Sequence, residues 1–129
     1  MILDSKLRFS EMNEEMTGIM RIMGLKSNEA RVLVFLMRGA EVTSREIERD
    51  TDLRQPEVSI AITSLMKKGW VKISNLLTEN KGRPVKVYCL VAPADEIIDQ
   101  IEESIEGDYN QQIELLERVR ALIHSLDDE

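Results

Sequence analysis

The sequence predicts a mainly helical fold with one small β-hairpin, and three observations in the middle of the chain predict it. A helix over residues 55–68 has Pro56 in its first turn, where the missing N–H needs no partner, and it is followed by Gly69. A basic hairpin over residues 70–91 comes directly after that helix, and a short helix over residues 43–51 comes before it. This order is the winged form of the helix-turn-helix, which places one helix in a DNA major groove and a cationic loop beside it.

The N-terminal part is predicted to form two helices. Residues 4–23 place apolar side chains mostly three or four positions apart as far as Gly24, which breaks the pattern. Ser27 is expected to cap a second helix over residues 28–38, whose almost wholly apolar run suggests a buried, central element ending at Gly39. The first helix carries a methionine stripe, which suits packing between helices better than an adaptable effector pocket. Its members are Met12, Met16, Met20 and Met23.

Local signals define the two helices of the predicted helix-turn-helix. Thr43 can cap the helix over residues 43–51, and Glu46 three positions later completes a capping box. Residues 53–55 then make the turn. In the helix over residues 55–68, apolar positions at helical spacing mark the side that is expected to be buried. These are Val58, Ala61, Ile62 and Leu65, which leaves Gln55, Ser59, Ile60 and Thr63 nearer the outer face.

The C-terminal half is predicted to contain the hairpin and one long helix. Alternating residues indicate strands at 70–74 and 85–91, with a polar loop over residues 77–83 between them. A last helix is expected to open at Pro93, and its apolar residues follow the spacing of a coiled-coil seam over about four heptads. A break near residues 107–110 stays open, because glycine weakens a helix.

Charge is segregated along the chain, whose formal net charge is −7 at pH 7. Residues 24–91 contain twelve Lys and Arg against eight Asp and Glu, whereas residues 92–129 contain two against twelve. A mildly basic middle is compatible with nucleic acid as a partner. The acidic end would be repelled by a duplex and would therefore orient the basic part toward it.

The residue inventory argues against several other classes of protein. One cysteine and one histidine fall short of an internal disulfide or a metal site. The sequence offers no nucleophile–base pair and no phosphate-binding glycine loop, so we expect neither an enzyme nor a cofactor. No apolar stretch is long enough to span a membrane, and the first residues do not resemble a secretory leader, which together predict a cytoplasmic protein.

Base contacts are expected from the exposed N-terminal half of the helix over residues 55–68. Gln55, Ser59 and Thr63 share one face at four-residue spacing, and glutamine can contact adenine through two hydrogen bonds. Ile60 could touch a thymine methyl group or pack against the wing, and the sequence does not separate the two. Cations are better suited to phosphates and to a narrow minor groove. The predicted DNA-binding residues are Arg54, Gln55, Ser59, Thr63, Lys67, Lys81, Arg83 and Lys86.

Three stretches resemble known families of transcription regulators. Residues 53–59 (Leu-Arg-Gln-Pro-Glu-Val-Ser) and 65–71 (Leu-Met-Lys-Lys-Gly-Trp-Val) are similar to the recognition-helix signature of the MarR family. Residues 82–90 (Gly-Arg-Pro-Val-Lys-Val-Tyr-Cys-Leu) resemble the wing of the TrmB-type sugar-responsive regulators, in particular their short, mainly archaeal relatives. The resemblance implies a homodimer that represses transcription. The long C-terminal sugar-binding domain of full-length TrmB proteins is not expected here, so a small-molecule effector stays unidentified.

We therefore expect three parts: an N-terminal dimerisation helix (1–23), a winged helix-turn-helix DNA-binding domain (24–92) and an acidic C-terminal dimerisation helix (93–129). The expected function is sequence-specific binding of double-stranded DNA by a homodimer, with the recognition helix in the major groove and the wing in the minor groove. The alternative is a winged-helix adaptor in a larger protein complex, which the acidic overall charge favours. A solvated helix face, a plain hairpin, and a purely dipole-stabilising role for Lys67 and Lys68 also stay open.

Overall fold

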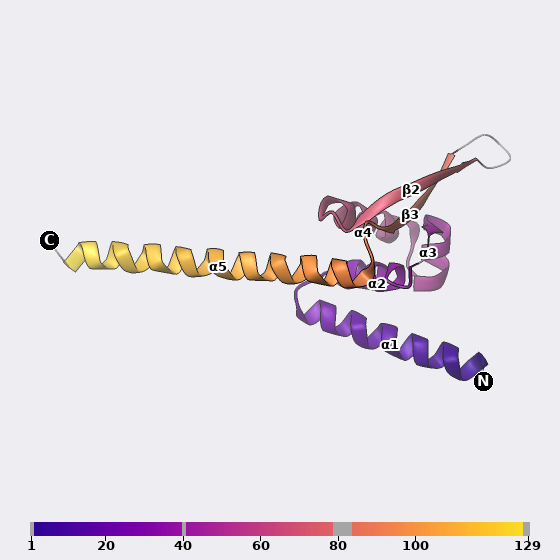
Figure 1. The fold of residues 1–129 in the computed structure, drawn as a ribbon, viewed down its shortest axis with the longest axis horizontal. Coiled ribbons are helices and arrows are strands. Elements are labelled where there is room, and N and C mark those ends of the chain that lie inside the picture. Colours follow the sequence, from indigo (N-terminus) through magenta and orange to yellow (C-terminus); the bar gives the residue numbers. More distant parts are fainter. Residues whose placement is uncertain (1, 40, 79–83, 128–129) are drawn as a thin grey trace. The chain divides into compact units, whose positions relative to one another are not determined.

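The computed structural model describes residues 2–39, 41–78 and 84–127 (Figure 1). In chain order the elements are α1 (Ile2–Ile22), α2 (Ser27–Leu36), β1 (Val42–Thr43), α3 (Ser44–Thr51), α4 (Gln55–Lys67), β2 (Val71–Thr78), β3 (Pro84–Leu90) and α5 (Ala94–Asp127). The fold is the predicted one, a winged helix-turn-helix with a helix on either flank. The chain divides into two compact units, Met1–Ala94 and Asp95–Glu129. Over the described ranges, no helix has the length and apolar character needed to cross a membrane.

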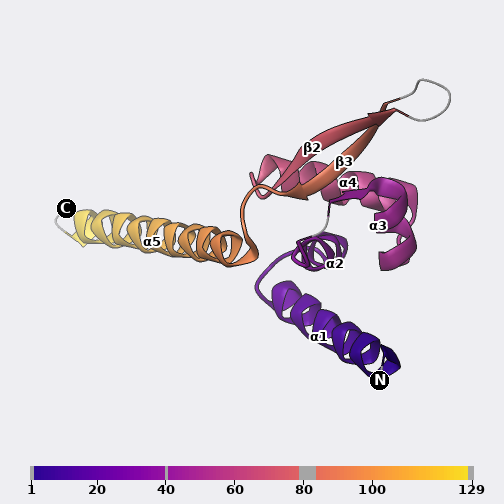
Figure 2. The same ribbon diagram turned by 45° about the vertical axis from the view of Figure 1, so that its right-hand side comes forward.

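Helix α2 is the centre of the first unit. Both views of the ribbon show α1 on one side of it and α4 on the other (Figures 1 and 2). Val32, Leu33 and Leu36 of α2 are fully buried, and so are Val58 and Leu65 of α4. Burying an aliphatic side chain of this size stabilises the fold by about 1.5–3 kcal/mol. The predicted buried stripe of α4 is confirmed, and this stripe fixes which side of α4 faces outward.

The start of α2 differs from the prediction, because Ser27 is not its cap. Ser27 is the first helical residue, and the N-cap position is held by Lys26, whose side chain makes no capping hydrogen bond. The Lys26 carbonyl accepts a hydrogen bond from the Ala30 N–H at 2.9 Å, so the backbone closes the first turn without a side-chain cap. At the other end α2 stops at Leu36, and Gly39 follows with φ +82°.

The methionine stripe of α1 is divided between the core and the surface. Met20 is buried and Met16 is half-buried, whereas Met12 and Met23 are exposed. Packing between α1 and α2 therefore accounts for only part of the stripe. Met23 is next to Ile22 in the chain, and Ile22 is also exposed.

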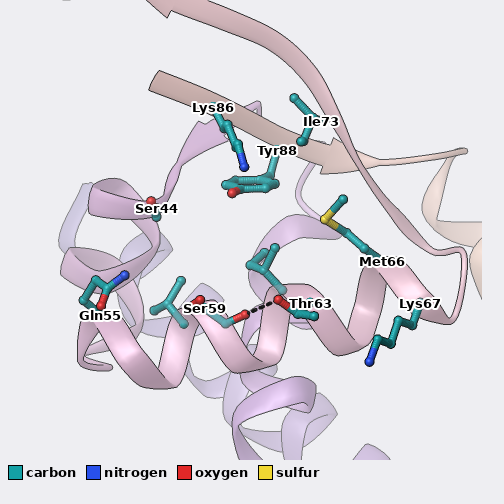
Figure 3. Close-up of a pocket in the computed structure, with 11 residues that line it drawn as sticks. Ser44, Gln55, Ser59, Thr63, Met66, Lys67, Ile73, Lys86 and Tyr88 are labelled. Atoms are coloured by element: carbon teal, nitrogen blue, oxygen red, sulfur yellow. Dashed lines mark hydrogen bonds between the residues drawn. The ribbon is translucent and has the colours of Figure 1, made fainter. Parts of the chain in front are cut away.

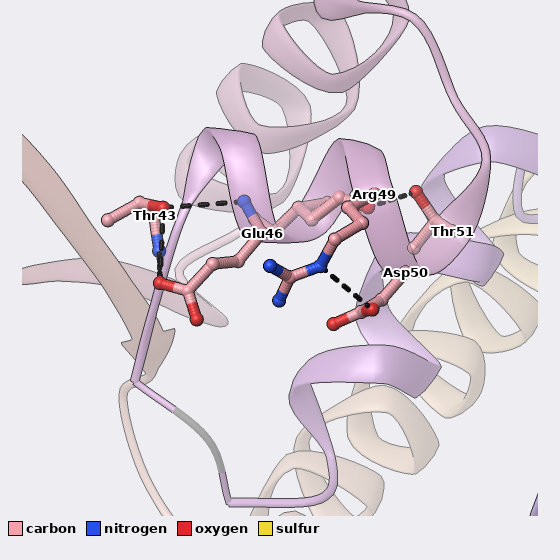
Figure 4. A network of polar contacts seen from close by, with 6 residues as sticks. Thr43, Glu46, Arg49, Asp50 and Thr51 are labelled. Carbon is pink, nitrogen blue, oxygen red and sulfur yellow. Dashed lines mark hydrogen bonds and ion pairs between the residues drawn. The ribbon is translucent and has the colours of Figure 1, made fainter.

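Helix α3 begins with the predicted capping box (Figure 4). The Glu46 N–H donates to Thr43 Oγ1 at 3.3 Å, and the Thr43 N–H donates to Glu46 Oε1 at 3.2 Å. The turn into α4 contains Asp52 in the left-handed region, at φ 59°. At the start of α4, the Arg54 N–H donates to Glu57 Oε1 at 2.9 Å. Gly69 has φ +81° directly after α4, a conformation that favours glycine.

The sheet contains one strand more than the predicted hairpin. Within the described residues its order is β1-β3-β2, with both pairs antiparallel. In the added pair, Val42 lies opposite Tyr88 and Thr43 opposite Val87. A strand of two residues has no alternation to detect, which is why the sequence did not reveal it. Because Thr43 also caps α3, this pair ties the sheet to the helix-turn-helix.

Strand β2 is longer than predicted. It runs from Val71 to Thr78, and Leu77 and Thr78 pair with Val85 and Pro84, although residues 77–83 were predicted to be loop. The register shifts between Ile73 and Asn75, which marks a bulge at this point. The remainder of the predicted loop, residues 79–83, lies outside the described residues.

The last helix is continuous. Helix α5 runs from Ala94 to Asp127 and passes through Gly107 without a break. A glycine inside a helix costs roughly 1 kcal/mol relative to alanine, which is small for a helix of 34 residues. Apolar side chains in its C-terminal half are 40–71% exposed. The large ones are Ile113, Leu115, Leu116, Val119, Leu122, Ile123 and Leu126.

A buried carboxylate joins α2 to the end of α4. Glu29 accepts hydrogen bonds from Ser64 Oγ at 2.5 Å and from Lys68 Nζ at 2.8 Å. Burial alone would raise the pKa of the Glu29 carboxyl, but the hydrogen bonds from Lys68 and Ser64 and the Lys68 charge outweigh it and lower the pKa. Lys68 also lies 5.4 Å from the centre of the Trp70 ring. Glu29 is therefore ionised at neutral pH, and its hydrogen bonds to Ser64 and Lys68 attach α2 to the C-terminal end of α4.

Candidate nucleic-acid interface

A groove of about 500 Å³ runs between the outer side of α4 and the sheet (Figure 3). Helix α4 supplies one wall, strands β2 and β3 supply the other, and Ser44 at the start of α3 closes one end. Lys86 and Tyr88 point from β3 toward α4. They share one face of the strand because they are two positions apart. The lining residues are Ser44, Gln55, Val58, Ser59, Ile62, Thr63, Met66, Lys67, Ile73, Lys86 and Tyr88.

Five of the predicted DNA-binding residues meet in this groove. Gln55, Ser59, Thr63 and Lys67 follow one another at four-residue spacing along α4, and Lys86 faces them from β3. All five are exposed to solvent. The outer face of α4 is therefore free to meet another molecule.

Hydrogen bonding inside α4 limits what each polar side chain can offer. Thr63 Oγ1 donates to the Ser59 carbonyl at 2.8 Å, so the hydroxyl proton of Thr63 is already used. Only its lone pairs remain, and Thr63 can act outward as an acceptor. Within the described ranges, the Gln55 amide and the Ser59 hydroxyl have no side-chain partner, so both can donate and accept.

The groove is cationic although the chain is acidic. Of the eleven described residues that line it, two are lysines and none is Asp or Glu. The nearest carboxylate on the first turn of α4 is Glu57, and its oxygens accept from the Arg54 N–H and from Asn28 Nδ2 of α2 at 3.3 Å. These bonds direct its carboxylate toward the N-cap of α4 and toward α2, and Glu57 is not one of the residues that line the groove. The groove is thus suited to a polyanion.

The two lysines at the end of α4 separate into different roles. Lys67 lines the groove and is exposed. Lys68 is bound to Glu29 and lies against Trp70, so it is structural. From the sequence, a purely structural role was open for both lysines and only Lys67 was among the predicted DNA-binding residues; the fold now distinguishes the two.

The other predicted residues stand apart from the groove or outside the described residues. Arg54 is exposed at the N-cap of α4, next to Gln55. Lys81 and Arg83, predicted for the tip of the wing, lie in the segment 79–83 that the structure does not describe.

Six lining residues were not among the predicted DNA-binding residues. Val58 and Ile62 were predicted only for the buried side of α4, and the other four are Ser44, Met66, Ile73 and Tyr88. Tyr88 and Ile73 lie opposite each other in the β2–β3 pair, and Tyr88 also pairs with Val42. Placing Tyr88 and Ile73 in the groove required the register of the three strands, which no local pattern in the sequence provides. By contrast, the helical period of the apolar residues in α4 was enough to predict which side of the helix faces outward.

The arrangement agrees with comparisons to known proteins. A family described as "Sugar-specific transcriptional regulator TrmB" matches residues 20–94, which cover the whole helix-turn-helix and the sheet. The chain belongs to the TrmB family. This TrmB-family chain is therefore a member of a family of transcriptional regulators, and the matched segment contains every residue of the groove.

A solved structure at low sequence identity shares the fold of this TrmB-family chain. A possible transcriptional regulator from Methanosarcina mazei Go1 superimposes with a TM-score of 0.65 at 13% identity, covering 78% of this chain and 83% of that chain. A MarR family regulator from Neisseria meningitidis gives a TM-score of 0.48 at 16% identity, covering 99% of this chain and 95% of that chain. A comparison with curated protein sequences finds no match.

Proposed function

We propose that this TrmB-family chain is a sequence-specific regulator that binds double-stranded DNA as a homodimer and represses transcription. The observation that carries the proposal is the groove beside α4. There an exposed polar stripe faces Lys86 with no acidic side chain among the described lining residues, in a protein whose net charge is −7. Repression is the simplest regulatory result of a dimer that occupies a promoter.

The outer face of α4 enters the major groove in this proposal. Gln55 is placed to pair with adenine through its amide, and Ser59 and Thr63 to contact further base edges. Lys67 and Lys86, on the two walls of the groove, would neutralise phosphates and thereby strengthen binding without selecting a sequence. Arg54 would contact a phosphate at the N-terminal end of the same helix.

The wing is assigned to the neighbouring minor groove. In the sequence, Lys81 and Arg83 come between β2 and β3, and both are assigned to the same duplex that α4 contacts. A narrow minor groove has an enhanced negative potential, which attracts arginine.

Dimerisation is assigned to the flanking helices, residues 1–23 and 93–129. In the C-terminal half of α5, one exposed apolar row consists of Leu115, Val119, Leu122 and Leu126, and a second row beside it contains Ile113, Leu116 and Ile123. An apolar face of two rows is wider than a single coiled-coil seam, so it can contact more than one helix of a second copy. Exposed apolar residues of α1 offer a further surface. They are Met12, Ile19, Ile22 and Met23.

A dimer of this kind would place two recognition helices in successive major grooves, roughly 34 Å apart along the duplex. The acidic side of α5 would be repelled by phosphates, which favours binding through the basic helix-turn-helix side.

An adaptor that joins proteins without reading DNA is the second candidate, and the net charge of −7 favours it. Selection of fragments from the genomic DNA of the source, followed by anisotropy titrations of the bound duplexes at several salt concentrations, distinguishes the two. We expect fragments that share a sequence and an affinity that falls steeply with salt. If no duplex binds at micromolar protein and low salt, the regulator proposal fails and the adaptor is favoured.

A further inference from the structure

Ile60 is a large apolar side chain that the fold leaves on the surface of α4. It is 69% exposed, although it lies near the middle of the helix. Its neighbours Ala61 and Ile62 are buried. An isoleucine in such a place is covered neither by the core nor by the described part of the wing.

The helical period places Ile60 in the outermost row of α4. The buried residues of α4 are Val58, Ala61, Ile62 and Leu65. At 3.6 residues per turn, the row directly opposite them consists of Pro56, Ile60, Thr63 and Lys67. Gln55, Ser59 and Met66 lie between this row and the sheet, where they line the groove. The alternative that Ile60 packs against the wing is therefore not supported by the described residues.

We propose that Ile60 reads the C5-methyl group of a thymine, an inference that rests on the proposed DNA binding. When a helix lies in the major groove, the row opposite its buried side comes closest to the base edges. The thymine methyl is the apolar group that the major groove presents at the base edges. Any polar base edge placed against Ile60 would lose water without gaining a hydrogen bond, which is unfavourable.

Thr63, in the same row, is compatible with an A·T pair near Ile60. Because its proton is bound to the Ser59 carbonyl, Thr63 offers only an acceptor. An acceptor favours the amino group of adenine or cytosine over the acceptor edge of guanine. Ile60 and Thr63 together therefore favour a step that contains both a thymine methyl and an amino group.

The test replaces single thymines in a duplex by deoxyuridine, which removes the methyl group and keeps the hydrogen-bonding edge. The duplex is the one that the full-length chain selects from a random library. For the wild type we expect about fourfold weaker binding at one thymine in each half-site, equivalent to about 0.8 kcal/mol for one buried methyl. Ile60→Ala should lose that dependence at the same thymine, whereas Ile60→Val should keep it.

Ile60→Ala should fold normally, because the side chain is exposed and alanine favours helices; its melting temperature checks this. If the wild type binds its selected duplex but no deoxyuridine weakens binding, the role of Ile60 is wrong while DNA binding stands. If the loss persists undiminished in Ile60→Ala, another residue reads the methyl group and the inference is wrong. If no duplex is selected at all, the proposed function fails together with this inference.

Discussion

At the scale of single residues, the fold places the identical side chains of Lys67 and Lys68 in different environments. Lys68 Nζ lies 2.8 Å from the carboxylate of Glu29, a buried group, and so contributes to stability. Lys67 is one position earlier on the helix and lines the groove. The pair therefore offers a matched comparison between a proposed DNA-binding residue and a structural one.

Lys67→Gln should weaken DNA binding and leave stability unchanged. Loss of one phosphate contact in each half-site, two per dimer, should make the negative slope of log K against log salt less steep by about 1.8. Lys68→Gln should instead cost about 1–3 kcal/mol of stability, because it leaves a buried carboxylate without one of its partners. Urea denaturation and anisotropy titration measure the two effects. Equal effects of both changes on binding and stability would contradict the division of roles.

Glu29 should make stability sensitive to acid. Its pKa in the folded protein is lowered below the ordinary value of 4.5, so its contribution is complete above that pH and is lost as the pH falls through the folded pKa. Glu29→Gln should therefore be less stable than the wild type at neutral pH, with a difference that shrinks as the pH falls below 4.5. Thermal melts from pH 7 down to pH 3 measure it. A difference that does not change with pH would contradict the assignment.

At the scale of secondary-structure elements, Thr43 connects two of them. Its backbone pairs with Val87 in the sheet, and its side chain caps α3. The sheet carries Lys86 and Tyr88 of the groove, and α3 leads into α4, so Thr43 connects the elements that precede both walls of the groove.

Thr43→Ala should cost about 1 kcal/mol, the usual effect of removing a threonine N-cap. The control is Thr63→Ala, which removes the same hydroxyl from the interior of α4. There the hydroxyl bonds only to its own helix, and alanine is the better helix former, so no loss is expected. The midpoints of urea denaturation compare the stability of the two variants. An equal loss of stability in both would show that the Thr43 cap does not contribute.

The elements that the sequence predicted are those with local signals. Helical period gave the four long helices and the outward side of α4, the capping box gave the start of α3, and Gly69 gave the end of α4. The elements and contacts that it missed join distant positions. The β1–β3 pair brings Val42 to Tyr88, and Ser64 and Lys68 reach Glu29 from 35 and 39 positions away. Such pairings leave no periodic mark in a single sequence.

At the scale of the whole molecule, the proposed binding to two half-sites requires a second copy of the chain. The exposed apolar rows of α5 occur in the acidic part of the chain, and the cationic groove occurs in the basic part. Assembly and DNA binding are thus assigned to different segments, which can be altered separately.

Val119→Glu should convert the dimer to a monomer, because it places a charge in the centre of an apolar row. Ser125→Glu adds the same charge to the same helix at a polar position and should leave the dimer intact. Sedimentation equilibrium measures the mass of each. The monomer should also bind a two-half-site duplex more weakly, because its two contacts are no longer linked. A wild type that sediments as a monomer would contradict the proposed dimer.

The central claim is that the outer face of α4 reads bases, and the affinity of the wild type and Gln55→Ala for duplexes that differ by single base pairs tests it most directly. The wild type should prefer one base pair at the position of Gln55 by about 1–3 kcal/mol, and the variant should lose that preference while keeping the others. If both proteins bind every duplex equally well, α4 does not read sequence and the claim is wrong.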